Sequence, residues 1–178
     1  MLKQDTSEAL RDCEGILIPS GIKITIKKGS LIMVTQALGN SYTVYVNGNL
    51  ARVKGTDGDA IGMVIVEHED VNKLDGSVED KVWEILKTCF DPEIPVNIVD
   101  LGLVYECNTT EDNGEFNVEV IMTLTAPGCG MGPVLVADIE DKIKSIVGVK
   151  SLNVELVFDP PWDRSMMSDV AKLQLGMM

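Results

Sequence analysis

Residues 116–146, FNVEVIMTLTAPGCGMGPVLVADIEDKIKSI, decide the fold of the larger part of this 178-residue chain. Residues 116–124 predict a β-strand. After them, apolar residues recur at helical spacing, with aspartate and lysine on the opposite face: Leu135, Ile139, Ile143 and Ile146. Val149–Phe158 predicts a second strand. Because a strand–helix–strand unit crosses over in the right-handed sense, we expect these two strands to be parallel in one sheet.

A helix is expected upstream of this unit. Ser77 and Asp80 form the spacing of an N-terminal capping box. Apolar residues then recur every three or four positions: Val78, Val82, Ile85, Leu86 and Cys89. The helix is expected to end at Asp91-Pro92, since a residue before proline avoids the helical region.

The remaining elements complete an α-β-β-α-β-α order. Leu101–Cys107 predicts a strand, and Glu111–Gly114 is a hairpin signal that joins it to the strand at 116–124. Ser168 is expected to cap a last short helix that ends at Gly176. We therefore expect a compact domain with a three-stranded mixed sheet.

The first part of the chain has a different pattern. Residues 22–26 and 42–46 alternate as strands do, and Asn47-Gly48 is typical of a tight hairpin turn. The predicted class is therefore α+β, with a small all-β domain before the α-β-β-α-β-α domain. The predicted boundaries are a loose arm over 1–13 with a short helix around Ser7–Arg11, a β domain over 14–67, a linker over 68–76 and the second domain over 77–178.

Composition and charge exclude several classes of function. Apolar residues make up 45% of the chain, enough to fill a core, and 28 acidic against 15 basic residues give a net charge of −13. That charge opposes nucleic acids and anionic membranes. No apolar run approaches the roughly 18–20 residues of a membrane span, and Met1–Asp5 lacks a signal-peptide pattern. We expect a cytoplasmic protein that binds neither nucleic acid nor membrane.

Four cysteines and one histidine limit the metal and nucleophile chemistry. The cysteines form no Cys-x-x-Cys pair and His68 is the only histidine, so a self-contained zinc or cluster site is not expected. Glycine-rich nucleotide loops and the usual metalloprotease and serine-hydrolase motifs are absent from the sequence. Cys89 and Cys107 lie on apolar faces and are expected in the core. The sequence does not decide between a buried and an exposed position for Cys13.

Cys129 is the strongest candidate for a reactive residue. It lies between the strand and the helix, just before Pro133, which suits a first helical turn. Free backbone N–H groups and the positive end of a helix favour a thiolate, so we expect a lowered pKa and a reactive or metal-binding sulfur. Glycines on both sides allow another molecule to approach. An inert cysteine in a tight turn is the alternative.

Three carboxylates precede the strand at 101–107: Asp91, Glu93 and Asp100. Glu93 or Asp100 could act as an oxygen ligand or proton acceptor beside Cys129. Alternatively, Asp91 caps a helix end and Asp100 binds backbone amides.

An aromatic residue follows the last strand. The prolines of Asp159-Pro160-Pro161-Trp162 stop the strand, and Trp162 is interpreted as a lid or interface residue. The methionine pairs at 166–167 and 177–178 extend an apolar contact patch or act as flexible filler. Because a short sheet and a Met-rich end leave apolar surface to cover, we expect a homodimer.

Three motifs, in order, resemble a known family. They are Asp91-Pro92-Glu93-Ile94-Pro95 with Asp100-Leu101-Gly102, then Thr123-x-Thr125-x-x-Gly128-Cys129, then Asp159-Pro160-Pro161-Trp162. Over about residues 77–177 this order resembles the metal-sulfur cluster biosynthesis family, formerly a domain of unknown function. The first half resembles the N-terminal domain of SufT-type proteins through three segments: Gln36–Gly39, Tyr42–Val44 and Asp57–Gly62.

The resemblance implies an auxiliary factor in iron-sulfur protein maturation, with a domain like those of iron-sulfur assembly proteins. It implies that Cys129 is the reactive cysteine, with further site residues near it: Asp91, Glu93, Asp100, Thr123 and Thr125. The implied cargo is a labile iron-sulfur cluster or iron, with none stably bound. The implied partners are scaffold or carrier proteins and recipient apoproteins. One thiolate cannot fill four cysteine positions, so a stable cluster would need a second subunit, a partner or a small thiol.

Three functions remain open at this point. The first is a non-enzymatic carrier in which Cys129 transiently binds iron or a cluster. The second is an enzyme with Cys129 as covalent nucleophile. The third is a protein–protein adaptor without metal binding, acting through Trp162 and the Met-rich end.

Overall fold

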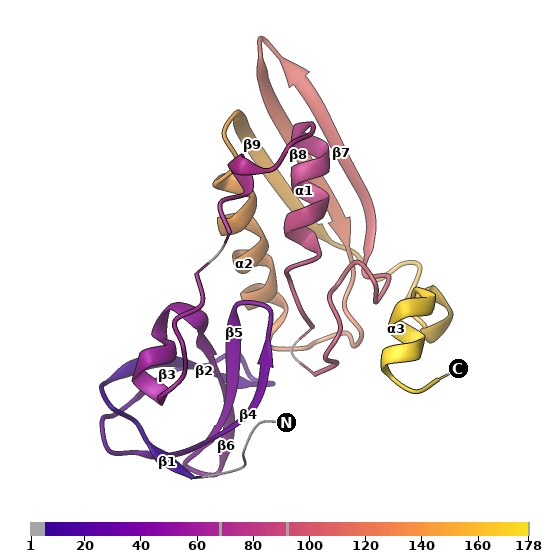
Figure 1. Ribbon diagram of the computed structural model, residues 1–178. Coiled ribbons are helices and arrows are strands. Elements are labelled where there is room, and N and C mark those ends of the chain that lie inside the picture. The colour runs from indigo at the N-terminus through magenta and orange to yellow at the C-terminus, as the bar shows by residue number, and fades with distance from the viewer. Residues whose placement is uncertain (1–5, 68, 92, 178) are drawn as a thin grey trace. The chain divides into compact units, whose positions relative to one another are not determined.

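The computed structural model describes residues 6–67, 69–91 and 93–177 (Figure 1). The sequence features at Met1–Asp5, His68, Pro92 and Met178 lie outside the described residues. The chain divides into two compact units, Met1–Glu69 and Asp70–Met178. The α+β class is confirmed, because a six-stranded all-β sheet comes first and a three-stranded mixed sheet with helices follows.

The first unit is built on an antiparallel sheet with strand order β1-β4-β5-β6-β2-β3. Its strands are β1 (Ser7–Glu8), β2 (Cys13–Ile18), β3 (Lys23–Ile26), β4 (Leu31–Leu38), β5 (Ser41–Val46) and β6 (Asn49–Lys54). The predicted hairpin turn joins β5 to β6, with φ of 50° at Asn47 and 81° at Gly48. The 3₁₀ helix η1 (Gly55–Ile61) follows β6, and the 3₁₀ helix η2 (Val71–Lys73) lies at the start of the second unit.

Residues 6–13 are neither a loose arm nor a helix, so both expectations for them are wrong. Ser7 pairs with Ile32 of β4, and the Ala9 N–H donates to the Ser30 carbonyl at 2.9 Å. Cys13 begins β2 and is buried. The edge of β4 offers unpaired backbone groups, so distant pairing overrides the polar local pattern.

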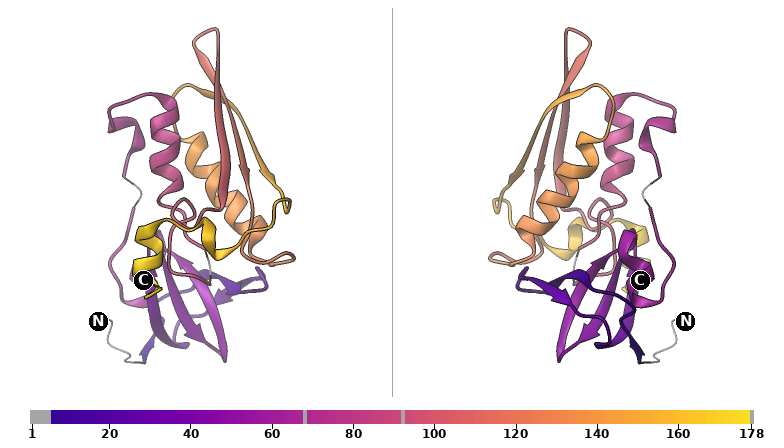
Figure 2. Two further views of the ribbon diagram at one scale, coloured as in Figure 1. Left: turned by 90° about the vertical axis from the view of Figure 1, so that its right-hand side faces the viewer. Right: turned by 90° about the vertical axis from the view of Figure 1, so that its left-hand side faces the viewer.

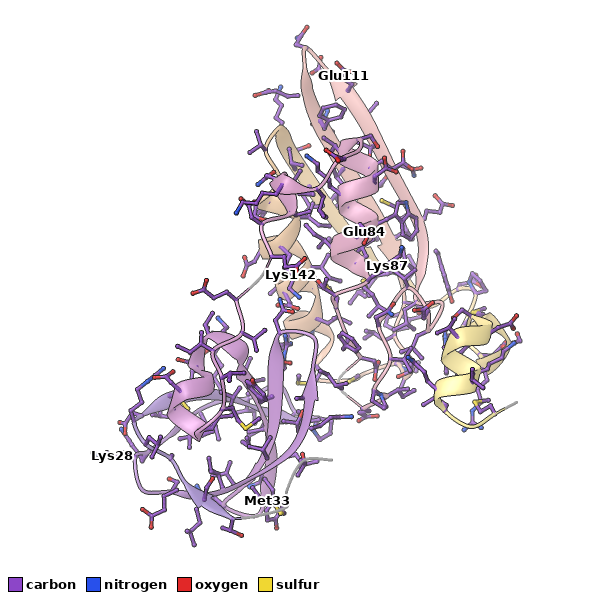
Figure 3. The ribbon with its side chains drawn as sticks, in the orientation of Figure 1. Lys28, Met33, Glu84, Lys87, Glu111 and Lys142 are labelled. Atoms are coloured by element: carbon purple, nitrogen blue, oxygen red, sulfur yellow. The ribbon has the colours of Figure 1, made fainter. Side chains whose placement is uncertain are left out.

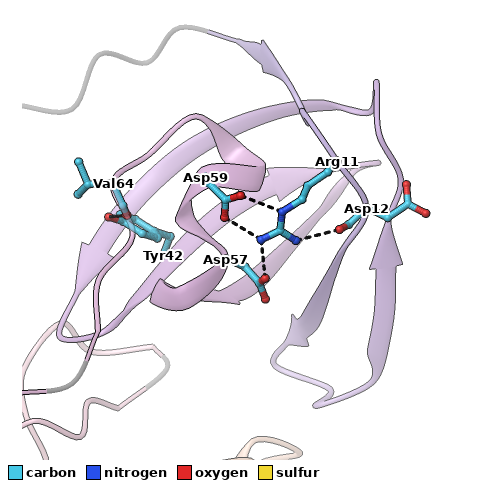
Figure 4. A network of polar contacts seen from close by, with 6 residues as sticks. All are labelled: Arg11, Asp12, Tyr42, Asp57, Asp59 and Val64. Atoms are coloured by element: carbon cyan, nitrogen blue, oxygen red, sulfur yellow. Dashed lines mark hydrogen bonds and ion pairs between the residues drawn. The ribbon is translucent and has the colours of Figure 1, made fainter.

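Arg11 fastens this first segment to η1 (Figure 4). Its Nε and Nη2 donate to the two carboxylate oxygens of Asp59 at 2.9 and 2.7 Å, and Nη2 also donates to Asp57 at 2.9 Å. Hydrogen bonds from Arg11 lower the pKa of Asp59. Nearby, the Tyr42 hydroxyl donates to the Val64 carbonyl at 2.9 Å, which holds the chain that follows η1.

The second unit follows the predicted α-β-β-α-β-α order. Its elements are α1 (Val78–Leu86), β7 (Val104–Asp112), β8 (Glu115–Met122), α2 (Gly132–Lys144), β9 (Val149–Leu156), the 3₁₀ helix η3 (Arg164–Met166) and α3 (Asp169–Gln174). The capping box at Ser77 and Asp80 is confirmed, since each side chain accepts the other's backbone N–H. Among the described residues, no helix is long and apolar enough to cross a membrane.

Helix α1 ends earlier than expected, at Leu86 and not at Asp91. The N–H groups of Thr88 and Cys89 bond back three residues, to Ile85 and Leu86, and close the helix with a tighter turn. Local backbone bonding therefore ends the helix before the proline.

Strand β8 is the centre of the three-stranded sheet. It pairs antiparallel with β7 and parallel with β9, which confirms the predicted parallel pairing. The hairpin between β7 and β8 turns at Asn113 and Gly114, with φ of 52° and 80°. Helices α1 and α2 lie on one side of this sheet (Figure 2). The β8 side chains that face them belong to the buried core: Val118, Val120 and Met122.

A buried lysine joins the two helices (Figure 3). Lys142 of α2 is 8% exposed, and its Nζ donates to the Thr88 carbonyl at 3.3 Å. It also forms an ion pair with Asp138 at 3.2 Å. The Asp138 carboxylate and the Thr88 carbonyl, which lies just after α1, thus take the place of the water that would hydrate the ammonium.

Candidate functional site

Three chain segments meet at one end of the three-stranded sheet. Strand β7 begins opposite the end of β8, and the parallel strand β9 ends at the same edge. The segments are therefore 91–103 before β7, 123–131 after β8 and 157–168 after β9. The Thr123 N–H donates to the Leu103 carbonyl, and the Val157 N–H to the Met122 carbonyl, both at 2.8 Å. All the predicted site residues lie on these segments.

Cys129 lies half-buried on the connection from β8 to α2 and is a free cysteine. Its carbonyl accepts the N–H of Gly132, the first residue of α2, at 3.1 Å. A Cβ on Gly132 would come within 2.9 Å of Leu124 Cδ1, whereas a Cβ on Gly128 would meet open space. The loop is therefore tightly packed after Cys129 and open before it. Within the described residues, the Cys129 thiol has no hydrogen-bond partner.

Asp91 links the first segment to the second. Its side chain is 4% exposed, and one carboxylate oxygen accepts the N–H groups of Glu93 and Ile94, both at 2.9 Å. The other oxygen accepts the Thr125 hydroxyl at 3.5 Å. Burial raises the pKa of Asp91, although these hydrogen bonds favour its charged form. Asp91 thus closes its own loop and does not cap the end of α1.

Asp100 links the first segment to the third. Its Oδ2 accepts the Asn97 side-chain amide at 2.6 Å, and its Oδ1 accepts the Ser168 hydroxyl at 2.9 Å. The Ser168 N–H also donates to the Asp100 carbonyl at 2.8 Å. The Asp100 carboxylate therefore binds side chains and not the backbone amides considered in the sequence.

The structure does not join Glu93 or Asp100 to Cys129. The Glu93 side chain is exposed, and its backbone N–H is the group that Asp91 holds. In the described part of the chain, no hydrogen bond connects either carboxylate to the Cys129 thiol. The contacts therefore pair Asp91 with Thr125 and Asp100 with Ser168.

Thr123 and Trp162 complete the predicted set. Thr123 is fully buried, and its hydroxyl has no hydrogen-bond partner among the residues that the structure describes. A buried polar group without a partner lowers the free energy of unfolding by about 1–3 kcal/mol. Trp162 is half-buried, and its indole Nε1 donates to the Leu101 carbonyl at 2.7 Å. The indole therefore holds the third segment against the first.

Sequence reasoning missed the roles of two residues near Asp100. Asn97 accepts the N–H groups of Val99 and Asp100, the pattern of an Asx turn, which its spacing before Asp100 could have indicated. Ser168 was predicted as the cap of α3 and is confirmed, since it accepts the Ala171 N–H at 3.1 Å. Its second bond, to the Asp100 carboxylate, has no local signal in the sequence.

The other three cysteines are buried or packed against a hydrophobic core. Cys89 is buried, as predicted. Cys107 is half-buried against the core, and burial, with Glu79 nearby, raises its pKa to about 11. Cys13 is buried in the first unit, and burial raises its pKa. Over the described ranges, no group of three or more His, Cys, Asp or Glu side chains is arranged to hold a metal ion.

Comparison with known proteins relates the second unit to characterised chains. Residues 79–156 match a family described as iron-sulfur cluster assembly protein. The chain is 43% identical over 98 residues to the Fe-S protein maturation auxiliary factor of Porphyromonas gingivalis. The aligned part is 55% of this chain and 90% of that relative. The chain is 42% identical over 86 residues to the Fe-S protein maturation auxiliary factor SufT of Staphylococcus aureus, over 48% of this chain and 94% of that relative.

A solved structure is similar to the same part of the chain. The crystal structure of a domain of unknown function, DUF59, from Bacillus anthracis is 36% identical, with a TM-score of 0.50. It covers 57% of this chain and 93% of that chain. The segment that matches the family contains the whole connection from β8 to α2, and with it Cys129.

Proposed function

The chain belongs to the iron-sulfur cluster assembly protein family, and from this premise we propose that it is an auxiliary factor in iron-sulfur protein maturation that passes iron or a cluster through Cys129. One observation carries the role of the cysteine. Cys129 is a free, half-buried thiol on an open-sided loop within the family segment, whereas Cys13 and Cys89 are buried. Thiolates are the ordinary ligands of iron-sulfur clusters.

The cargo is a substrate held by few protein ligands. The Cys129 sulfur forms a bond to iron and releases its proton to water, with no transfer of electrons. Because one thiolate supplies one of the usual four cluster ligands, a partner protein, a second copy or a small thiol supplies the others. Such a bond is exchanged when a recipient offers more thiolates, which is the property of a carrier and requires no catalysis.

The contacts around the thiol assign supporting roles to its neighbours. Asp91 and Thr125 hold the loop at 91–96 against the segment that carries Cys129. Asp100 and Trp162 hold the segment after β9 against the start of β7. These four residues position the segments around Cys129, and Cys129 alone touches the cargo.

Anaerobic reconstitution with iron and sulfide tests the proposal. The wild type is expected to show a labile absorption band and to pass iron and sulfide to an apo-ferredoxin. Cys129→Ala is expected to lose both, while Cys107→Ala, the matched control, keeps them. Equal transfer by wild type and Cys129→Ala would contradict a role for this sulfur and favour an adaptor that never holds the metal.

A homodimer is part of the proposal, because two copies would supply two Cys129 thiolates. Its support is exposed apolar surface on α3, at Val170 and Leu173, and just after it, at Met177. Light scattering across a dilution series is expected to give the mass of two chains. A constant mass of one chain would remove the dimer while leaving the role of Cys129 open to its own test.

A further inference from the structure

The face of the three-stranded sheet opposite α1 and α2 is uncovered within the second unit (Figure 2). The register places three side chains from each strand on it: Glu106, Asn108, Thr110, Asn117, Glu119, Ile121, Ser151, Asn153 and Glu155. All are exposed except Asn117 and Ile121, which are half-buried. Ile121 is the apolar member of this set, and its charged members are all glutamates. We call this set the open face.

A shallow, open groove of about 570 Å³ continues the open face at the end where β7 begins. It shares Glu106 and Ile121 with the open face. The other lining residues are Gly102, Val104, Tyr105, Val157, Asp159, Pro160 and Met166. The lining is thus largely apolar, and among its described residues the charged ones are Glu106 and Asp159.

Contacts within the chain hold the walls of the groove in place without a bound partner. The Tyr105 hydroxyl donates to the Pro160 carbonyl at 2.7 Å, which holds one wall against the other. Gly102 has a φ of +76°, and a Cβ there would collide with the Met166 carbonyl. A groove built by such close contacts loses little conformational entropy when it binds a ligand.

Charge is distributed unequally along the chain. Residues 1–69 hold 8 acidic and 7 basic residues, whereas residues 70–178 hold 20 acidic and 8 basic residues. The net charge of −13 is therefore carried almost entirely by the second unit. Its field attracts cationic segments and raises their local concentration at the open face.

We propose that the open face and its groove dock a basic segment of a partner protein. An apolar side chain of that segment enters the groove between Ile121 and Met166. Its lysine or arginine side chains face Glu106, Glu119 and Glu155. The inference rests on the proposed function for its biological setting, since it names the kind of partner that comes to the Cys129 end of the sheet.

The same observations disfavour other occupants. A nucleic acid or an anionic membrane would be repelled by the glutamates. A second copy of the chain, related by two-fold symmetry, would bring the same three glutamates against themselves, and facing like charges are destabilising. A small cation would leave the apolar groove unfilled. A peptide with both basic and apolar side chains uses both parts of the surface.

Fluorescence anisotropy with a defined probe tests the docking surface on the full chain. The probe is a labelled eight-residue peptide with four lysines around a central leucine–tryptophan pair. One comparison peptide has glutamates in place of the lysines, and another has serines in place of the apolar pair. We expect the basic peptide to bind, the acidic peptide not to bind and the serine peptide to bind about fivefold more weakly, because it buries less apolar surface.

Matched variants separate the open face from the overall charge. The triple variant Glu106→Gln, Glu119→Gln, Glu155→Gln is expected to weaken binding of the basic peptide about tenfold, as loss of three exposed ion pairs should. The control Glu79→Gln, Glu84→Gln, Asp141→Asn removes the same charge from α1 and α2 and is expected to change affinity less than about twofold. Amide shifts in NMR spectra should map to residues near Ile121 and Met166.

Several results would overturn the inference. They are no binding of the basic peptide up to about 1 mM, equal loss in both triple variants, or a wild-type dimer that the open-face variant dissociates. The docking test is independent of the thiol. An open-face variant should raise the recipient concentration needed for half-maximal transfer while Cys129 still binds cargo, whereas Cys129→Ala should abolish transfer with peptide binding intact.

Discussion

The two units of this chain use polar groups in opposite ways. In the first unit, ion pairs such as Arg11 with Asp57 and Asp59 lie at the surface and fasten a strand to a helix. The polar or charged side chains that are buried, among the described residues, are Asp91, Thr123 and Lys142, and all lie in the second unit. Because burial of such groups is costly, their concentration marks the unit in which structure is shaped by function.

The units also differ in what their chain connections do. In the first unit, tight turns such as Asn47-Gly48 join neighbouring strands with few residues. In the second, three long segments converge at one end of the sheet and hold one another through side chains. The candidate site therefore lies where the connections are long and bonded to one another, and variants in the two units test this difference.

The largest contrast in stability is expected between two lysines. Lys142→Ala removes a buried ammonium bonded to Asp138 and to the Thr88 carbonyl, and should lower the free energy of unfolding by about 3 kcal/mol. Lys27→Ala breaks an exposed pair with Asp12 in the first unit and should cost less than about 1 kcal/mol. Urea denaturation of both variants measures the difference, and equal costs would break the comparison.

Two glycines with similar backbone angles should respond differently. Gly102 and Gly48 have φ of +76° and +81°, so alanine is strained at both. At Gly102 an added Cβ also meets the Met166 backbone, whereas at Gly48 it meets open space. Gly102→Ala should cost about 2–3 kcal/mol and Gly48→Ala about 1 kcal/mol. Thermal or urea unfolding measures both costs. A smaller cost for Gly102→Ala than for Gly48→Ala would show that the groove is not fixed by this close contact.

The sequence predicted those parts of the fold that have local signals. The capping box at Ser77 and the parallel pairing of β8 with β9 follow from spacing and from the handedness of crossovers. Residues 6–13 were predicted wrongly, because their partner strand β4 is distant in sequence and no local pattern encodes that pairing.

The same limit applies to the candidate site. The motifs selected the segments, but not the bonds of Asp100 to Ser168 and of Trp162 to Leu101, which join residues more than sixty positions apart. That Glu93 points its backbone and not its carboxylate toward Asp91 is likewise a matter of loop closure. The reactivity of Cys129 remains a prediction.

Alkylation compares one cysteine from each unit. Cys129 is half-buried on its loop, whereas Cys13 is 6% exposed in the first core, and burial raises its pKa. Iodoacetamide at pH 8 should modify Cys129 at least about tenfold faster than Cys13, because a buried thiol must wait for local opening and forms less thiolate. Peptide mass spectrometry over time gives both rates, and equal rates at the two thiols would exclude a selectively reactive Cys129.

The smallest contrast is in pH dependence. Burial raises the pKa of Asp91, so its contribution to stability is present below the ordinary aspartate value and is lost as pH rises through the raised pKa. Arg11 lowers the pKa of Asp59, whose contribution is present above the ordinary value and is lost as pH falls through the lowered pKa.

Asparagine variants measure these two contributions. In the wild type, Asp91 lowers stability as the pH rises above about 4, and Asp91→Asn should abolish that decrease. Asp59 lowers stability as the pH falls below about 4, and Asp59→Asn should abolish that decrease. Urea midpoints from pH 3 to pH 7 reveal both slopes. Slopes of the same sign for the two residues would contradict the contrast between buried and surface carboxylates.

We propose that the second unit carries iron or a cluster on the Cys129 thiol. The most direct measurement is iron and sulfide transferred per chain to an apo-ferredoxin after anaerobic reconstitution, for wild type, Cys129→Ala and Cys107→Ala. We expect transfer by wild type and Cys107→Ala and none by Cys129→Ala. Undiminished transfer by Cys129→Ala would contradict the proposal.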